Sequence, residues 1–202
     1  CVESMAIYLL DELNNQVAER NNKVKMHFTI NNSENIYEML ENGQVDLAYV
    51  IEPIRQKNIS LTPLFTEQMV LVASDAMKLE GSSIHPNQLD IRDACQFDWK
   101  EQNLNTWFEH WFNPKELPYL KTNSPPFAFS FMKSHVCWSV VPHSMGKRLE
   151  REAGMKLYTI KEPPQERICY RAASNGRHTL YPDAIKYWDR EMKRFILSKP
   201  WL

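Results

Sequence analysis

The sequence predicts an α/β fold made of two Rossmann-like lobes that are joined by two crossover segments. Helical and strand patterns alternate along the first fifty residues, an order that usually gives a parallel sheet. The same alternation starts again near residue 95. A last helical pattern at residues 182–197 follows the second series, although the first series has too few helices to cover its sheet. That helix is therefore expected to return to the first lobe.

The first lobe begins with a predicted helix, strand, helix and strand. Apolar residues recur every three or four positions in the helices, and they alternate or run continuously in the strands. Ser4 is the predicted N-cap of the first helix, and Asn32 and Ser33 offer caps for the second, which ends at Gly43. These elements are expected at residues 5–17, at residues 24–30, through Ile36 and Leu40, and at residues 45–51.

The second series is expected to form the second lobe. A strand at residues 68–73 ends the first series, and a polar loop at residues 75–93 is the expected boundary between the lobes. The strands of the second series are predicted at residues 95–98, 119–122, 136–141, 156–160 and 167–172, and its helices at residues 104–112, 127–133 and 142–153, the last of which ends at Gly154. If the final helix docks on the first lobe, residues 1–72 and 173–202 form lobe I and residues 73–172 form lobe II. The chain then passes twice between the lobes, and these two crossover segments form a hinge beside a cleft. Small molecules usually bind in such clefts, at the carboxyl ends of parallel strands.

Charge and cysteine content exclude several classes of protein. Lys and Arg number 24 against 25 Asp and Glu, which argues against direct nucleic-acid binding by this chain. No apolar run is long enough to span a membrane. The four cysteines form no Cys-x-x-Cys pair and have no histidine at ligand spacing, so we expect free thiols packed in apolar segments, no metal and no cofactor. This cysteine pattern is typical of a cytoplasmic protein.

Signals for catalysis are poor. The chain has no Gly-x-Ser-x-Gly motif and no glycine-rich phosphate loop. Asp93 with Asp98 is a conceivable acid–base pair, and Cys137 with His135 or His143 is a conceivable nucleophile and base. Carboxylates near strand ends are usually solvated, and Cys137 lies in a segment predicted to be buried. We therefore predict that the chain is not an enzyme.

Three segments resemble the effector-binding domain of LysR-type transcriptional regulators. Residues 40–50 are similar to the family's turn of leucine, two residues, glycine, two residues and aspartate-leucine-alanine. Residues 61–73 resemble its proline-leucine, glutamate and leucine-valine crossover, and residues 129–145 resemble the stretch that ends in an apolar strand and a proline. The family's glycine-x-glycine is missing, because residues 135–139 contain no glycine.

The resemblance implies a type II periplasmic-binding-protein fold that binds a small, anionic effector between its lobes. It also implies homodimers or tetramers, and DNA binding only through a winged helix-turn-helix that is missing from this chain. The family's first strand would precede Cys1 and is expected to be absent or reduced to a stub. The alternative on the same fold is the solute-binding protein of a transporter.

Polar residues at helix starts are candidate ligand contacts, because unpaired backbone N–H groups and the positive end of the helix dipole attract carboxylates and phosphates. Ser4, Asn32, Ser33 and Ser124 stand at predicted helix starts. By resemblance, these places line the effector cavity. The alternative is that the same side chains only cap their helices.

Two further places are expected to face the cleft. Trp99 and Lys100 follow a short strand, so Trp99 would wall the pocket and Lys100 would pair with an acidic effector, unless they are a packed tryptophan and a surface lysine. Pro142 lies at a strand-to-helix turn that would close the pocket.

Two surfaces are expected to meet a partner subunit. Half of the aromatic residues in the helix at residues 107–112 are predicted to be core, and the others to be available to a partner. The resemblance further implies that the helix at residues 5–17 meets the helix at residues 145–153 of a second copy. The charges at that contact would be Asp11 and Glu12, with Tyr8, opposite Lys147, Arg148 and Arg151.

Overall fold

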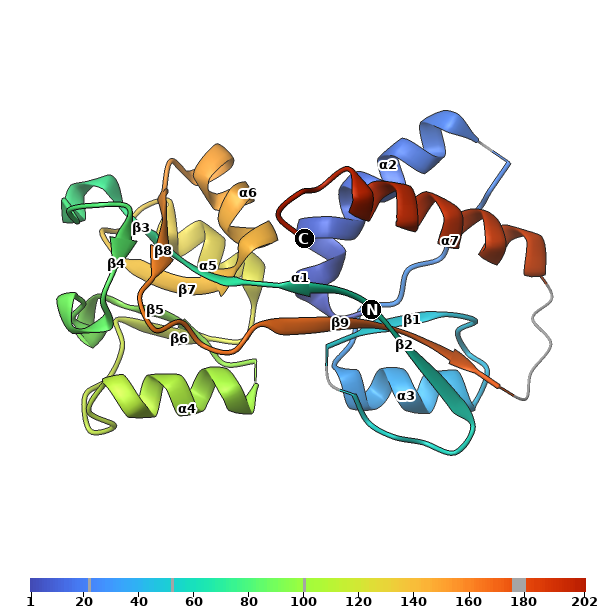
Figure 1. The fold of residues 1–202 in the computed structure, drawn as a ribbon, viewed down its shortest axis with the longest axis horizontal. Coiled ribbons are helices and arrows are strands. Elements are labelled where there is room, and N and C mark those ends of the chain that lie inside the picture. Colours follow the sequence, from blue (N-terminus) through green and yellow to red (C-terminus); the bar gives the residue numbers. More distant parts are fainter. Residues whose placement is uncertain (22, 52, 100, 176–180) are drawn as a thin grey trace. The chain divides into compact units, whose positions relative to one another are not determined.

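The computed structural model describes residues 1–21, 23–51, 53–99, 101–175 and 181–202. The chain forms two compact units (Figure 1). Unit 1 comprises Cys1–Glu67 and Ile168–Leu202, and unit 2 comprises Gln68–Arg167. Each unit combines helices with a sheet, which confirms the predicted α/β class.

Unit 1 is built from a small sheet with helices packed on it. Its sheet has the order β1-β9-β2, with β1 antiparallel to β9 and Ala48 opposite Ala172. The helices α2 and α7 lie side by side (Figure 1) and share a core with α3. The elements are α1 (Glu3–Met5), the π-helical η1 (Ala6–Leu10), α2 (Asp11–Arg20), α3 (Ser33–Glu41), β1 (Ala48–Val50), β2 (Ile59–Glu67), β9 (Arg167–Ser174, whose first residue belongs to unit 2) and α7 (Pro182–Leu197).

Two predictions for unit 1 were wrong. The first helix starts earlier than predicted, with Val2 as its N-cap, so Ser4 lies inside the first turn and is not the cap. Residues 24–30 form no strand, although Val24 and Met26 are half-buried as the alternating pattern predicted. A strand needs a neighbouring strand to pair with, whereas the Thr29 carbonyl at the end of this segment accepts a hydrogen bond from the amino terminus of Cys1 at 2.8 Å.

Unit 2 contains a mixed sheet. The strand β3 is antiparallel to both β7 and β8, whereas β4 is parallel to β8 and β5 is parallel to β6. A parallel bridge between Ala94 and Trp138 places β5 beside β7. The elements are β3 (Met69–Ala73), η2 (Asp75–Met77), β4 (Ser83–Ile84), η3 (Pro86–Gln88), η4 (Ile91–Asp93), β5 (Cys95–Phe97), α4 (Gln102–Trp111), β6 (Leu120–Thr122), α5 (Pro125–Met132), β7 (Trp138–Pro142), α6 (His143–Ala153) and β8 (Lys156–Ile160).

The expectation of a parallel sheet holds for only part of unit 2, and in unit 1 the strand β1 is antiparallel to β9. The strands β4 to β8 that alternate with helices or short turns run in one direction, as successive βα units require. The strand β3 enters from the crossover and runs the other way. The prediction was wrong for this strand because direction depends on where the chain enters the sheet, which hydrophobic periodicity does not encode.

Aromatic side chains form much of the core of unit 2. Trp107 and Phe108 of α4 are buried, and Phe108 stacks on the fully buried Trp138 with 6.2 Å between ring centroids. Trp111 and Phe112 at the end of α4 are half-buried. In the described part of the chain, no helix is long and apolar enough to cross a membrane.

Candidate functional site

The start of α3 lies beside the start of α1 in unit 1. The Asn31 amide donates to the Cys1 carbonyl at 3.2 Å, and the Val2 amide donates to the Tyr49 carbonyl in β1 at 3.4 Å. These bonds bring Ser4, Asn32 and Ser33 to one edge of unit 1. Three of the predicted ligand contacts therefore lie near one another.

The cap predicted for α3 is present. Asn32 is the N-cap, and its Oδ1 accepts a hydrogen bond from the Asn35 amide at 2.9 Å. Ser33 is the first helical residue and is buried, and Ser4 is also buried. Asn32 therefore has a structural role whether or not a ligand binds beside it.

The other predicted contacts gather at one edge of unit 2. Because β5, β6 and β7 are parallel, their carboxyl ends meet at the same edge of the sheet. The Asp98 amide donates to the Thr122 carbonyl at 2.9 Å and extends the pairing beyond β5. Trp99, Ser124 and Pro142 follow or end these three strands, whereas Lys100 lies outside the described residues.

Ser124 and Pro142 differ in detail from their predicted roles. Ser124 occupies the N-cap position of α5, but its side chain makes no capping hydrogen bond. Pro142 is the last residue of β7 and the N-cap of α6, so the prediction that it opens the helix as its first residue was wrong by one position.

Two charged residues that sequence analysis missed lie beside Trp99. Glu101 is the N-cap residue of α4, and its Oε1 lies 3.0 Å from the Arg167 guanidinium. The guanidinium carbon of Arg167 lies 5.1 Å from the centroid of the Trp99 ring, which itself stacks on Phe97 with centroids 4.3 Å apart. Arg167 thus contacts both an acid and an aromatic face.

This ion pair is largely removed from water. The side chain of Arg167 is 5% exposed and that of Glu101 is 13% exposed. Oε1 of Glu101 is buried, and no donor among the described residues forms a hydrogen bond with it, despite the short distance to Arg167. The guanidinium therefore offsets the burial of this oxygen by its charge, without a well-aligned hydrogen bond.

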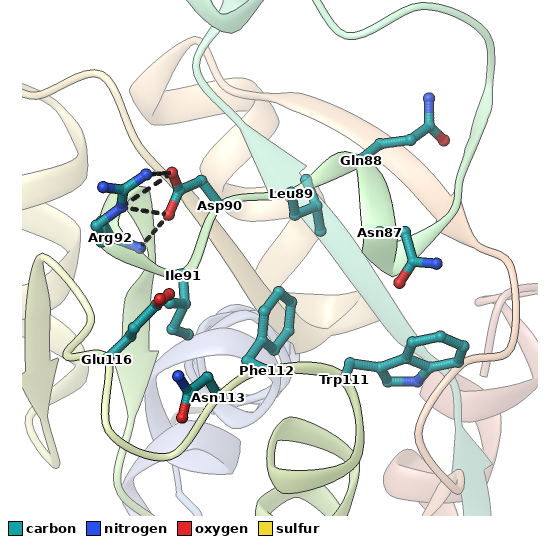
Figure 2. Close-up of a pocket in the computed structure, with 10 residues that line it drawn as sticks. All are labelled: Asn87, Gln88, Leu89, Asp90, Ile91, Arg92, Trp111, Phe112, Asn113 and Glu116. Atoms are coloured by element: carbon teal, nitrogen blue, oxygen red, sulfur yellow. Dashed lines mark hydrogen bonds and ion pairs between the residues drawn. The ribbon is translucent and has the colours of Figure 1, made fainter.

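A separate hollow of about 410 Å³ lies on unit 2, and Figure 2 shows its lining. Its residues come from the segments that precede β5 and β6, so it is at the amino ends of these strands, the edge opposite to Trp99 and Ser124. Asp90 and Arg92 form a two-pronged ion pair in it, and this pairing holds the pKa of Asp90 below its usual value. The lining consists of Asn87, Gln88, Leu89, Asp90, Ile91, Arg92, Trp111, Phe112, Asn113 and Glu116.

The hollow is a poor ligand site. Arg92 is already neutralised by Asp90, and the Asp90 carbonyl accepts a hydrogen bond from the Trp138 indole at 2.7 Å. None of the predicted site residues that the structure describes is part of its lining. Trp111, which is half-buried, is part of its lining.

The thiols are packed as predicted. Cys95, Cys137 and Cys169 are buried, and none of them forms a disulfide with another described cysteine. Burial raises the pKa of the Cys95 thiol to about 12 and that of the Cys137 thiol to about 11. Both are therefore poor nucleophiles at neutral pH. Within the described ranges, no group of three His, Cys, Asp or Glu side chains is placed to hold a metal ion.

The fold has close counterparts among solved structures. The reduced regulatory domain of OxyR from Pseudomonas aeruginosa superposes with a TM-score of 0.75 at 15% identity, covering 98% of this chain and 95% of that one. The regulatory domain of CcmR from Synechocystis PCC6803, in complex with 2-PG, gives 0.73 at 19% identity, with 98% and 95% covered. Full-length CbnR in complex with its target DNA gives 0.73 at 13% identity, with 96% and 66% covered.

These likenesses confirm the type II periplasmic-binding-protein-like fold. The chain spans about two thirds of the length of full-length CbnR. No curated protein sequence matches it significantly. A model of the LysR substrate binding domain matches residues 1–182, most of the chain. The chain therefore belongs to the LysR substrate binding domain family.

Proposed function

We propose that this chain is the ligand-sensing part of a LysR-type transcriptional regulator. It binds a small, anionic metabolite and transmits binding to DNA-binding domains that lie outside residues 1–202. Family membership favours this function over the solute-binding protein of a transporter. In this proposal each compact unit is one lobe of the effector-binding domain, and the protein works in the cytoplasm as a dimer or tetramer.

The observation that carries the proposal is the grouping of polar residues at two edges. Ser4, Asn32 and Ser33 share an edge of unit 1. Trp99 and Ser124 share the carboxyl-end edge of unit 2, where small molecules bind in α/β sheets. With Lys100 and Pro142, these residues are the proposed ligand contacts.

The proposed mechanism is a shift between two arrangements of the protein. An effector shifts such an equilibrium only by its difference in affinity for the two states. The ligand is bound and released unchanged, because the chain is a sensor and not an enzyme. Incubation with a bound metabolite should therefore return it without chemical change.

A thermal-shift screen of carboxylated and phosphorylated metabolites tests this function. A ligand at one hundred times its dissociation constant adds about 2.7 kcal/mol of stability, which raises the melting temperature of a domain of this size by roughly 5–10 °C.

Ser4→Ala and Ser33→Ala should weaken binding of a hit while the domain stays folded. Ser198→Ala, at the end of α7, is the matched control and should bind normally. Unchanged affinity in both test variants would refute the proposed contacts.

A further inference from the structure

The Glu101–Arg167 pair has chemical features that restrict the ligand. It presents a positive and a negative group side by side, 3.0 Å apart, and both side chains are largely buried. The carboxylate oxygen that faces Arg167 is also the oxygen that receives no hydrogen bond from any described residue. The pair is therefore charged and largely desolvated, and its two groups form an ion pair without a well-aligned hydrogen bond.

A ligand with a single charge fits this pair badly. An anion drawn to Arg167 would be repelled by the neighbouring carboxylate of Glu101, and a cation drawn to Glu101 would be repelled by the guanidinium. Both repulsions are strong where water is excluded. A ligand that carries both charges avoids them, because its carboxylate can face Arg167 while its ammonium faces Glu101.

An α-amino acid has this arrangement of charges. Its carboxylate and ammonium are attached to one carbon, so their separation is similar to that of the two protein groups. A guanidinium matches the planar geometry of a carboxylate, and an ammonium supplies three donors that suit the carboxylate of Glu101.

The aromatic ring beside the pair supplies an apolar surface. Trp99 is half-buried and stacks on the buried Phe97. The guanidinium of Arg167 lies over the face of the Trp99 ring. These contacts hold the ring and the guanidinium in a fixed relation before any ligand arrives. The backbone carbon and side chain of an amino acid would lie against such a ring.

We propose that Glu101, Arg167 and Trp99 form a recognition site for the zwitterionic head of an amino acid. This inference rests on the proposed function and sharpens it, because the anionic group of the effector becomes a carboxylate that has an ammonium next to it. Arg167 binds the carboxylate, Glu101 binds the ammonium, and Trp99 packs against the carbon between them.

Matched ligands test the proposal directly. The twenty proteinogenic amino acids are titrated one by one by calorimetry, and each hit is compared with its deaminated acid and its decarboxylated amine. The proposal expects at least one amino acid to bind, with an affinity at least tenfold higher than that of either analogue. Binding of the deaminated acid as tightly as the amino acid would overturn it, and so would the absence of any amino-acid binding.

Variants separate recognition from a merely structural role. Glu101→Gln keeps the shape of the side chain and removes its charge, so it should lower the affinity for the amino acid at least tenfold and leave that for the deaminated acid equal or higher. A purely structural role would lower both affinities together. Arg167→Gln should lower the affinity for both the amino acid and the deaminated acid. If Arg167→Gln does not fold, Glu101→Gln still tests the proposal. Glu116→Gln, an exposed acid in the separate hollow, is the control.

The outcome also distinguishes this inference from the proposed function. A carboxylate or phosphate without an amine that binds, and whose binding depends on Ser33, would support the sensor function and overturn the amino-acid assignment. A screen in which no metabolite of any class binds would contradict both.

Discussion

A buried glutamate in unit 1 and a partly buried glutamate in unit 2 have different partners. Glu191 of unit 1 is 2% exposed, and both of its oxygens accept hydrogen bonds, from Arg20 at 2.9 Å and from Arg194 at 2.8 Å. Glu101 of unit 2 has one buried oxygen without a donor among the described residues. Glu191 connects α7 to α2 through well-formed hydrogen bonds, whereas Glu101 forms an ion pair with Arg167 in which the buried oxygen has no well-aligned hydrogen bond.

The same contrast appears at two helix starts. Asn32 caps α3 through a hydrogen bond to the Asn35 amide, whereas Ser124 stands at the same position of α5 and makes no capping bond. Polar groups that the chain satisfies by itself hold the fold together. Polar groups that it leaves unsatisfied, near the carboxyl ends of parallel strands, are the better candidates for ligand contacts.

The largest expected effect on stability comes from removing the cation in unit 2. Arg167→Met leaves the carboxylate of Glu101 largely buried without its countercharge. Breaking a buried pair on one side costs about 3–5 kcal/mol, which lowers the melting temperature of a domain of this size by roughly 10 °C. Thermal denaturation followed by circular dichroism measures the change.

The control for this variant is Arg151→Met. Arg151 lies on α6 with its side chain 70% exposed, so its ion pair with Glu152 contributes little. Its melting temperature should stay close to that of the parent chain. If Arg167→Met is equally harmless, the Glu101–Arg167 pair is solvated, and the contrast with Glu191 disappears.

A smaller loss is expected from Glu191→Gln in unit 1. Hydrogen bonds to charged groups are worth about 1.5–3 kcal/mol each, but Arg20 and Arg194 are more than half exposed and can turn to water. We therefore expect a net loss of about 2 kcal/mol in urea denaturation. Glu12→Gln, which removes an exposed pair with Lys199, should change stability by less than about 0.5 kcal/mol. Equal losses for the two variants would show that the burial of Glu191 adds nothing.

These pairs also show what sequence analysis was able to predict. The bounds of α7 and β8 were predicted as the structure has them, because apolar periodicity and flanking residues act over a few positions. The Asn32 cap is equally local and was confirmed. The strand at residues 24–30 was predicted wrongly, since pairing depends on a distant neighbour. The Glu101–Arg167 pair was missed for the same reason, because its two members come from widely separated segments.

The helix caps give a prediction of smaller size. Asn32→Ala removes the acceptor for the Asn35 amide and should cost about 1 kcal/mol. Ser124→Ala should cost close to nothing, because Ser124 makes no capping bond. Urea denaturation of both variants measures the difference. If Ser124→Ala costs as much as Asn32→Ala, the serine is structural, and it should be removed from the proposed ligand contacts.

The buried thiols differ from these charged groups because they stay protonated. Their burial should therefore have almost no effect on the stability of the fold near neutral pH. Burial raises the pKa of Cys95 to about 12 and that of Cys137 to about 11, so at pH 8 only about one thiol in a thousand or fewer is ionised. Iodoacetamide should therefore modify both slowly in the folded chain and quickly in guanidinium chloride, as peptide mapping by mass spectrometry would measure.

The folded state keeps these protons above pH 8.5 while the unfolded state loses them, so stability should fall as pH rises from there toward 11–12. Rapid modification of the folded chain at pH 8 would mean that the thiols are accessible, and thiol chemistry would then replace reversible ligand binding as the simplest sensing mechanism for unit 2.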